Sequence, residues 1–436
     1  MLNSVLKGER SVIKMNAKRI LAIILTALMV FTFLTSCGGD TEKGVSYDEK
    51  LINKDQGGEA SGLDADENFR RAFSESAFDM LAAGIEDGKG KNMLLSPLSI
   101  YSALAMTALG AKGETQAEMS KVLGSIDAVD AARYLYALKK ELDGNERIKI
   151  ALANSLWMRE NAVSVEEDFL KNSRDFYDAD AFYAKFDKET LNDINSWIEE
   201  KTDGMIKDML SEIPESTVMY LINALCFEGE WVEKYQSFSV REGEFASYSG
   251  EKREASLMYS EEQYYLSDGE ASGFIKPYSD TRYGFVALLP DEGMDVYDYA
   301  KSLTAENFSA MLSGKERAHV NAAIPEFKYE YEDSLRNELK SLGMNAAFDN
   351  ADLTGIGTSP NGDLFISDVF HKTFIEVSPE GTKAGAATVV AVDAEGAYIG
   401  DELKTYEVHL DRPFVYAITD LENGISHFVG ILADVK

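Results

Sequence analysis

The chain has 436 residues and a formal net charge of −32 at pH 7, because 75 acidic side chains outnumber 43 basic ones. A surface this negative repels nucleic acid and anionic lipid, and we expect no nucleic-acid partner. The charge either speeds encounter with basic proteins or serves only solubility, and charge alone does not decide between the two. Only two cysteines are present, which leaves stability to the apolar core rather than to a disulfide framework.

Residues 1–37 have the features of a secretory signal. Lys14, Lys18 and Arg19 precede the apolar run 20–34, which is short for a membrane-spanning helix. The run ends in Leu-Thr-Ser-Cys37, which resembles the bacterial lipoprotein box. That resemblance implies cleavage before Cys37 and a lipid on its sulfur.

The alternative for this segment is an uncleaved N-terminal anchor, and either form holds the rest of the chain outside the cytoplasm. Met1 and Met15 both remain candidates for the start, because the signal is complete from Met15. The expected location is extracellular, as a membrane-anchored lipoprotein or a secreted protein.

Residues 38–67 are polar, rich in glycine and acidic residues, and without apolar periodicity. We expect a disordered acidic tether there. Residues 1–37 carry five basic and one acidic group, a net +4, so the exported part is near −36. With Cys37 modified, Cys226 is its only cysteine, and no intramolecular disulfide is expected.

Helices are predicted first along the remaining chain. Residues 68–85 have helical periodicity, Ser96 and Pro97 are typical of a helix start, and Thr115 with Glu118 predicts a capping box. The other expected helices cover 129–142, 166–177, 191–202, 297–312 and 334–342.

Strands are predicted mainly after residue 217. An earlier strand is expected where apolar residues alternate over 148–158, and another near Phe182. No linker rich in Pro, Gly or Ser divides residues 68–436, so we predict one large α+β domain with helices against a large sheet.

Enzyme motifs are absent from the sequence. The four histidines are scattered without the spacing of a zinc helix, and neither a G-x-S-x-G elbow nor a phosphate-binding loop occurs. We therefore expect no catalytic residue, no metal and no cofactor.

The most informative stretch is 370–400. Residues 370–378 alternate as a strand, and after Pro379 a segment of small residues follows. Counted with period two from Thr382, one face of this segment is uncharged, whereas the other carries Lys383 and Asp393. Chance is sufficient to give an exposed loop this pattern. A segment that later enters a sheet as a strand requires it, because its inward face must be uncharged.

This stretch resembles the hinge and reactive-centre loop of the serpins. Four further segments resemble motifs of that family in the same order: 92–100 (NMLLSPLSI), 217–231 (TVMYLINALCFEGEW), 285–293 (FVALLPDEG) and 411–416 (DRPFVY). The resemblance implies a large, mainly antiparallel central sheet, smaller sheets, about eight or nine helices and an exposed loop over residues 379–404.

The resemblance also assigns roles to residues. The hinge would comprise Gly381, Thr382, Lys383, Ala384, Gly385, Ala386, Ala387 and Thr388. A buried polar cluster termed the shutter would comprise Ser96, Ser99, Asn223 and His371, with Trp231 above it at the breach, where the loop enters the sheet. For a lone histidine at a strand start, a satisfied core residue is also the ordinary interpretation.

The implied activity is suicide inhibition of a serine protease. The protease would cut the loop and remain attached as an acyl-enzyme while the loop inserts as a new strand. Counting from the hinge places the cut at Glu395-Gly396, with Val392, Asp393 and Ala394 as neighbouring candidates; counting back from Pro413 gives Glu402-Leu403. Small aliphatic residues favour an elastase- or subtilisin-like target, whereas Asp393 or Glu395 would suit an acid-specific protease.

Two rivals remain at the level of sequence. The chain could be a non-inhibitory binding or carrier protein on the serpin fold, or a solute-binding lipoprotein with two lobes. The motif series argues against the second. A monomer is expected, with the target protease as covalent partner and the membrane reached through the lipid on Cys37.

Overall fold

The computed structural model describes residues 60–382 and 403–436. Cys37, the hinge from Lys383 to Thr388 and all the candidate cut residues lie outside the described part. The described residues form ten helices, rather than about eight or nine. They are α2 (Glu67–Gly88), α3 (Pro97–Ala108), α4 (Gly113–Val122), α5 (Ala128–Asp143), α6 (Glu167–Tyr177), α7 (Lys188–Lys201), α8 (Val296–Ser302), α9 (Ala305–Ser313), α10 (Arg336–Ser341) and α11 (Ala346–Asp349). The prediction of one helix over 297–312 is wrong, because α8 ends at Ser302 and α9 begins at Ala305. The four-residue α11 is too short for sequence periodicity to reveal.

Two large sheets confirm the α+β class. A six-stranded sheet has the order β11 (Phe327–Ser334), β13 (Phe370–Val377), β14 (Gly381–Thr382), β5 (Met219–Glu230), β2 (Ile148–Arg159) and β4 (Asp180–Ala184). All its neighbours are antiparallel except β2 and β4.

A nine-stranded sheet holds most of the C-terminal half. Its order is β1 (Met93–Leu95), β17 (Ile425–Leu432), β16 (Phe414–Asp420), β9 (Tyr283–Pro290), β8 (Ala271–Pro277), β7 (Lys252–Ser267), β10 (Glu316–Pro325) and β15 (Thr405–His409), with β6 (Val240–Ala246) paired to β7. The short strands β3 (Ser164–Val165) and β12 (Gly357–Thr358) pair separately.

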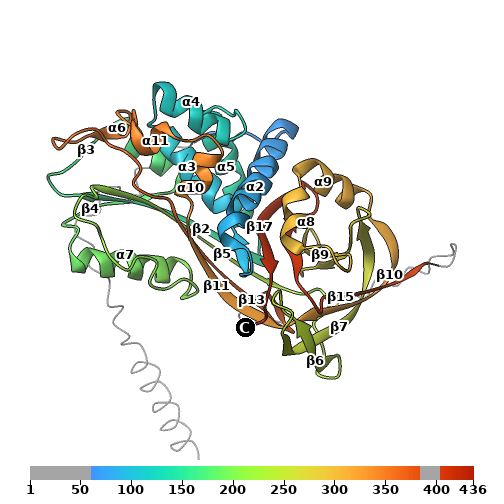
Figure 1. Cartoon of the computed structure of the whole chain (residues 1–436). Helices are drawn as coiled ribbons and strands as arrows, with labels where there is room; N and C mark the ends of the chain where they lie inside the picture. The colour runs from blue at the N-terminus through green and yellow to red at the C-terminus, as the bar shows by residue number, and fades with distance from the viewer. Residues whose placement is uncertain (1–59, 383–402) are drawn as a thin grey trace, which may run out of the picture. The chain divides into compact units, whose positions relative to one another are not determined.

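Helices cover both faces of the six-stranded sheet (Figure 1). On the outer face, α7 packs through Trp197 on an apolar cluster that includes Trp157 of β2 and Phe182 of β4. On the inner face, α3 contacts β5 and also β17 of the other sheet. The largest apolar cluster therefore lies on this inner side.

The helix-start signals are confirmed at one position and wrong at another. Ser96 is the N-cap of α3, with Pro97 in the first turn, and its hydroxyl accepts from the Ser99 N–H at 3.3 Å. The prediction of a capping box at Thr115 and Glu118 is wrong, because α4 begins at Gly113 and has no side-chain cap. Thr115 instead accepts from the Asp352 N–H, and Glu118 from the N–H groups of 345 and 346.

Residues 60–66, the described end of the expected tether, lie against α5. The Leu63 N–H donates to the Arg133 carbonyl at 3.2 Å, and Tyr134 donates to the carboxylate of Asp66, the N-cap of α2. The tether expected over 38–67 is therefore corrected at its C-terminal end, because these contacts fix the chain. Its part before residue 60 stays a prediction.

Candidate functional site

The first two residues of the predicted hinge lie between two strands of the six-stranded sheet. Gly381 and Thr382 form β14, which pairs with β13 on one side and β5 on the other. Thr382 is opposite Val377 of β13 and Gly229 of β5. In the described residues, no ladder joins β5 directly to β13. The sheet is therefore open below Thr382, between two strands that already flank the hinge.

Backbone contacts hold the turn before β14 against the segment that follows β5. The Trp231 N–H donates to the Glu380 carbonyl at 3.1 Å, and the Tyr235 N–H to the Pro379 carbonyl at 3.0 Å. The Trp231 indole Nε1–H donates to the Ser378 carbonyl at 2.9 Å. Pro379 contributes only its carbonyl, so the N–H that proline lacks is not needed here.

Thr382 itself lies in an aromatic pocket. Its side chain is 2% exposed, and its hydroxyl is 2.7 Å from the Tyr278 hydroxyl. The Tyr278 ring stacks on Trp231 with centroids 4.6 Å apart. Trp231 therefore lies beside Thr382, and its role at the breach stays a prediction.

A buried ion pair supports this aromatic pocket, and sequence reasoning missed it. Lys276 Nζ lies 2.9 Å from Glu262 Oε1, and the two side chains are only 2% and 7% exposed. The ammonium also lies 4.4 Å from the Tyr235 ring centroid and 5.6 Å from that of Trp231. The available signal was a lone lysine inside the run Gly-Phe-Ile-Lys276-Pro.

The polar cluster at the middle of the sheet is divided in two. The Ser96 N–H donates to His371 Nε2 at 3.1 Å. Asn223 does not pair with this group; its Nδ2 donates to Asn154 Oδ1 at 2.7 Å. Asn223 Oδ1 is buried without a hydrogen-bond partner among the described residues. The two halves face each other across the open part of the sheet.

Asn154 is the member that sequence reasoning missed. Its Nδ2 donates to the Tyr177 carbonyl at 2.8 Å, and the side chain is buried. The signal was a buried amide in the middle of the apolar strand 148–158. The amide nitrogen of Asn223 donates to Asn154, whereas its carbonyl oxygen Oδ1 has no donor among the described residues. Asn223 Oδ1 is therefore available to accept a hydrogen bond from another group.

Burial lowers the pKa of His371 from 6.5 to about 4, partly offset by a backbone hydrogen bond with Leu94. His371 is therefore neutral at pH 7, and Nε2 acts as an acceptor, as its contact with Ser96 requires. His427, on β17, is also fully buried, and burial lowers its pKa to about 4.

These histidines predict acid sensitivity. The unfolded chain binds the His371 proton near pH 6.5 and the folded chain only near pH 4, so stability falls as the pH falls between those values. We expect His371 to account for about 3 kcal/mol of free energy of unfolding lost between pH 7 and pH 4. Urea titrations at pH 7 and pH 4 should therefore show that His371→Asn loses about 3 kcal/mol less free energy of unfolding between the two pH values than the parent protein does. The control His409→Asn, at a side chain that is 41% exposed, should behave as the parent; equal losses in all three proteins would contradict the assignment.

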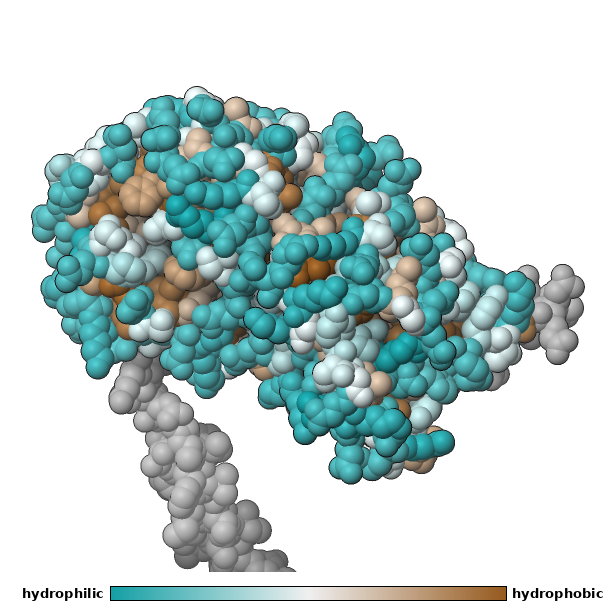
Figure 2. Space-filling model, in the orientation of Figure 1, coloured by the Kyte–Doolittle hydropathy of each residue, from teal (hydrophilic) through white to brown (hydrophobic). Residues whose placement is uncertain are grey.

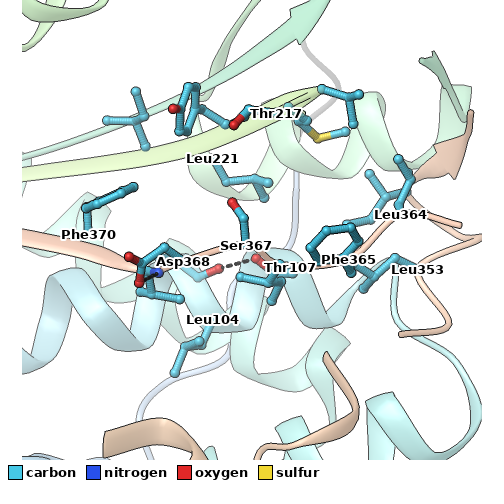
Figure 3. Close-up of a pocket in the computed structure, with 18 of the residues that line it drawn as sticks. Leu104, Thr107, Thr217, Leu221, Leu353, Leu364, Phe365, Ser367, Asp368 and Phe370 are labelled. Atoms are coloured by element: carbon cyan, nitrogen blue, oxygen red, sulfur yellow. Dashed lines mark hydrogen bonds between the residues drawn. The ribbon is translucent and has the colours of Figure 1, made fainter. Parts of the chain in front are cut away.

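The open part of the sheet contains a cavity of about 200 Å³ (Figure 3). Its walls include residues 219–223 of β5 and 367–371, and its floor includes Ser99, Leu104 and Thr107 at and along α3. In Figure 3, Leu221 and Leu104 lie on opposite sides of it, with Phe365 and Leu364 at one end. The molecular face in Figure 2 is mostly hydrophilic, with apolar atoms showing in hollows.

A smaller cavity of about 10 Å³ lies directly below the hinge. It is lined by Thr382, by Phe227 of β5, by Ile375 of β13, and by other residues of the two sheets: Phe374, Glu376, Ile418 and Phe428. The two cavities mark the same path, from β14 downward between β5 and β13.

No other chemistry is evident in the described residues. Within 60–382 and 403–436, no group of three His, Cys, Asp or Glu side chains is arranged to hold a metal ion. In the same ranges, no helix combines the length and apolar character needed to cross a bilayer.

Comparison with known proteins identifies the family. The profile of the family "Serpin (serine protease inhibitor)" matches residues 71–435. A serpin-like protein of Thermococcus kodakarensis is 32% identical over 356 residues, covering 80% of this chain and 82% of its own length. The leukocyte elastase inhibitor of Xenopus laevis is 31% identical, covering 81% and 95%.

Among solved structures, the thermophilic serpin tengpin in its native state matches with a TM-score of 0.81 and 40% identity, over 88% of this chain and all of tengpin. The chain therefore belongs to the serpin family. The expected family and fold are confirmed, whereas the assignment of hinge, shutter and cut residues stays a prediction.

Proposed function

We propose that this serpin is a suicide-substrate inhibitor of serine proteases that acts by inserting its cut loop between β5 and β13. The main support for the proposal is that the register of β14, extended along both neighbouring strands, places the loop opposite the residues that line the larger cavity. Continuing the pairing of β14 down both neighbours places residues 388–392 opposite 219–223 on one side and 367–371 on the other. Both segments line the cavity of about 200 Å³.

The same register supports the role of the shutter. It places Thr388 opposite Asn223 and opposite His371. A threonine hydroxyl both donates and accepts. Thr388 would therefore supply the donor that Asn223 Oδ1 lacks among the described residues and would join the two halves of the divided cluster.

The register also explains the uncharged face of the loop. Thr382 shares the buried inner face with Val377, so every second residue after it would face inward: Ala384, Ala386, Thr388, Val390 and Val392. Ala384 would enter beside Phe227 and Ile375, where the cavity is only about 10 Å³. A charge or a large side chain on this face would oppose insertion.

The chemistry begins with the protease. Its serine oxygen would attack the carbonyl carbon before the cut bond, the C–N bond would break, and the new amine would leave with a proton from the protease. The loop would then be held to the protease by an ester and free to insert. Inhibition results when insertion distorts the protease before water cleaves the ester.

Register favours the cut at Glu395-Gly396 over Glu402-Leu403. Val392 would lie opposite Met219, the first residue of β5, and Glu395 would lie just beyond the end of the strand. Insertion would thus carry the protease to the far end of the sheet. The residues before the cut, Val392 and Ala394 among them, support an elastase- or subtilisin-like target.

A panel of proteases tests the proposal. We expect the chain from Gly38 onward to form a complex that resists denaturing gels with an elastase or subtilisin. Mass spectrometry should place the cut between Val392 and Tyr398: a released peptide beginning at Asp393 or Glu395 fits cleavage after Val392 or Ala394 by such a protease, whereas one beginning at Gly396 fits an acid-specific protease. Trypsin and a Glu-specific protease are the comparison enzymes. Cleavage by every enzyme without any complex would refute inhibition and favour the binding or carrier function.

We also propose that the protein is exported and held on the membrane as a monomer through a lipid on Cys37. The signal and lipoprotein box of residues 1–37 support this location. Incorporation of labelled fatty acid that Cys37→Ser abolishes would test it.

A further inference from the structure

Charged side chains form a row across the outer face of the six-stranded sheet, level with the end of β14. Lys149 of β2 pairs in register with Glu228 of β5, and Lys328 of β11 with Glu376 of β13. Lys328 Nζ lies 3.0 Å from Glu376 Oε2. From one edge to the other, the row is positive, negative, then a gap, then negative and positive.

The gap separates two carboxylates of the same sign. Glu228 has no ion-pair partner within 4.0 Å among the described residues, and the Glu376 side chain is 37% exposed. Both lie on the outer face. Glu376 alternates with the buried inward residues His371, Thr373 and Ile375 of β13, and Glu228 is two residues from Cys226, which packs in the outer apolar cluster with Trp197. A cation between the two carboxylates would complete an alternating row, and cross-strand pairs of opposite charge stabilise a sheet.

The pairing of Thr382 specifies which residue comes next. Thr382 is opposite Gly229 and Val377, so the following residue would lie opposite Glu228 and Glu376. That residue is Lys383, the first after the described β14. Successive strand residues alternate faces, so its side chain would extend outward, toward the two carboxylates.

We propose that Glu228 and Glu376 form a charge slot for Lys383 of the same chain. This inference rests on the proposed function, because the slot is filled only when the loop enters the sheet. Lys383 is then a positioning residue: it fixes the register of the first inserted residue and favours the earliest step of insertion, in competition with hydrolysis of the acyl-enzyme.

Charge reversal at Lys383 tests the slot. Lys383→Glu would set three carboxylates in a line, and we expect about a tenfold rise in the molecules of serpin consumed per protease inactivated, measured at low salt. Because the row is exposed, 0.5 M salt should remove most of the effect. Adding Glu228→Lys and Glu376→Lys to Lys383→Glu again sets opposite charges in the slot and should recover part of the parent value, reduced by repulsion of the new lysines from Lys149 and Lys328.

Lys404→Glu is the matched control. It makes the same change of charge beyond the other end of the loop, on an exposed lysine 2.9 Å from Glu316, and should leave the stoichiometry unchanged. If Lys404→Glu raises the stoichiometry as much as Lys383→Glu does, the change of charge acts on the encounter with the protease, and the proposed charge slot is wrong. A Lys383→Glu effect that persists in high salt or is not rescued even in part would also overturn the slot.

A second readout separates the slot from the proposed function. Each variant is cut in the loop by a protease that forms no complex, and the melting temperatures of cut and uncut protein are compared. If the parent gains stability on cutting but inhibits nothing, insertion occurs without inhibition, and a smaller gain in Lys383→Glu still supports the slot. Equal gains in parent and Lys383→Glu would overturn it.

Discussion

Replacing Thr382 with arginine should turn the protein from an inhibitor into a substrate. Thr382 is 2% exposed against Tyr278, and the Lys276 ammonium lies 5.6 Å from the adjacent Trp231 ring. Because Thr382 already lies buried in the sheet, an arginine here would displace β14, and the cut loop would insert only by burying a guanidinium, at a cost of several kcal/mol. Each 1.4 kcal/mol added to the insertion barrier slows insertion about tenfold. Hydrolysis of the acyl-enzyme would then be faster than insertion, and the protease would be released in active form.

The measurement is the number of serpin molecules consumed per protease inactivated, together with the fraction cut but not complexed on denaturing gels. We expect the first to rise about tenfold or more for Thr382→Arg. Thr382→Ser is the matched control, because it keeps the hydroxyl that meets Tyr278. Unchanged inhibition by Thr382→Arg would show that this residue need not occupy the sheet and would contradict the proposed mechanism.

Removing the cation of the buried ion pair should destabilise the folded protein strongly. Lys276→Met leaves the Glu262 carboxylate, 7% exposed, without its partner 2.9 Å away. Breaking a buried pair in this way typically costs about 3–5 kcal/mol, because one charge stays buried and uncompensated. Urea unfolding monitored by fluorescence and circular dichroism should show that loss in the uncut protein.

The double variant Lys276→Met with Glu262→Leu separates an unpaired charge from lost packing. Because both charges are gone, we expect it to recover most of the lost stability. If Lys276→Met costs less than about 1 kcal/mol, the pair is not acting as a buried ion pair. If the double variant is no better than Lys276→Met, contacts of Lys276 with the Tyr235 and Trp231 rings are the dominant contribution.

Local signals predicted the elements well where the residues that matter are neighbours in sequence. The alternation over 370–378 gave β13 and its buried face, and Ser96 with Pro97 gave the start of α3. Thr115 and Glu118 failed because their partners, the backbone of residues 345–352, lie more than 200 positions away. Nothing local distinguishes a side chain that caps its own helix from one that caps a distant segment.

The contacts among the candidate site residues did not follow from the sequence. Ser96 donates to His371 and Asn223 to Asn154, and neither Asn154 nor the pair Lys276–Glu262 was anticipated. Each of these contacts joins separate strands or a strand and a helix start. Their partners depend on which strands become neighbours, and that order is fixed by packing of the whole core.

By itself, the sequence determined the family, the α+β class and a loop whose period-two face carries no charge, because these are properties of residue order along one segment. Only the tertiary structure decided that β5 and β13 stand apart below Thr382, that a cavity lies between them, and that each of these strands carries a carboxylate, Glu228 or Glu376, in register with a lysine of its outer neighbour. These features involve segments about 150 residues apart in sequence. They therefore depend on which strands pack side by side in the folded protein, which no local sequence pattern specifies.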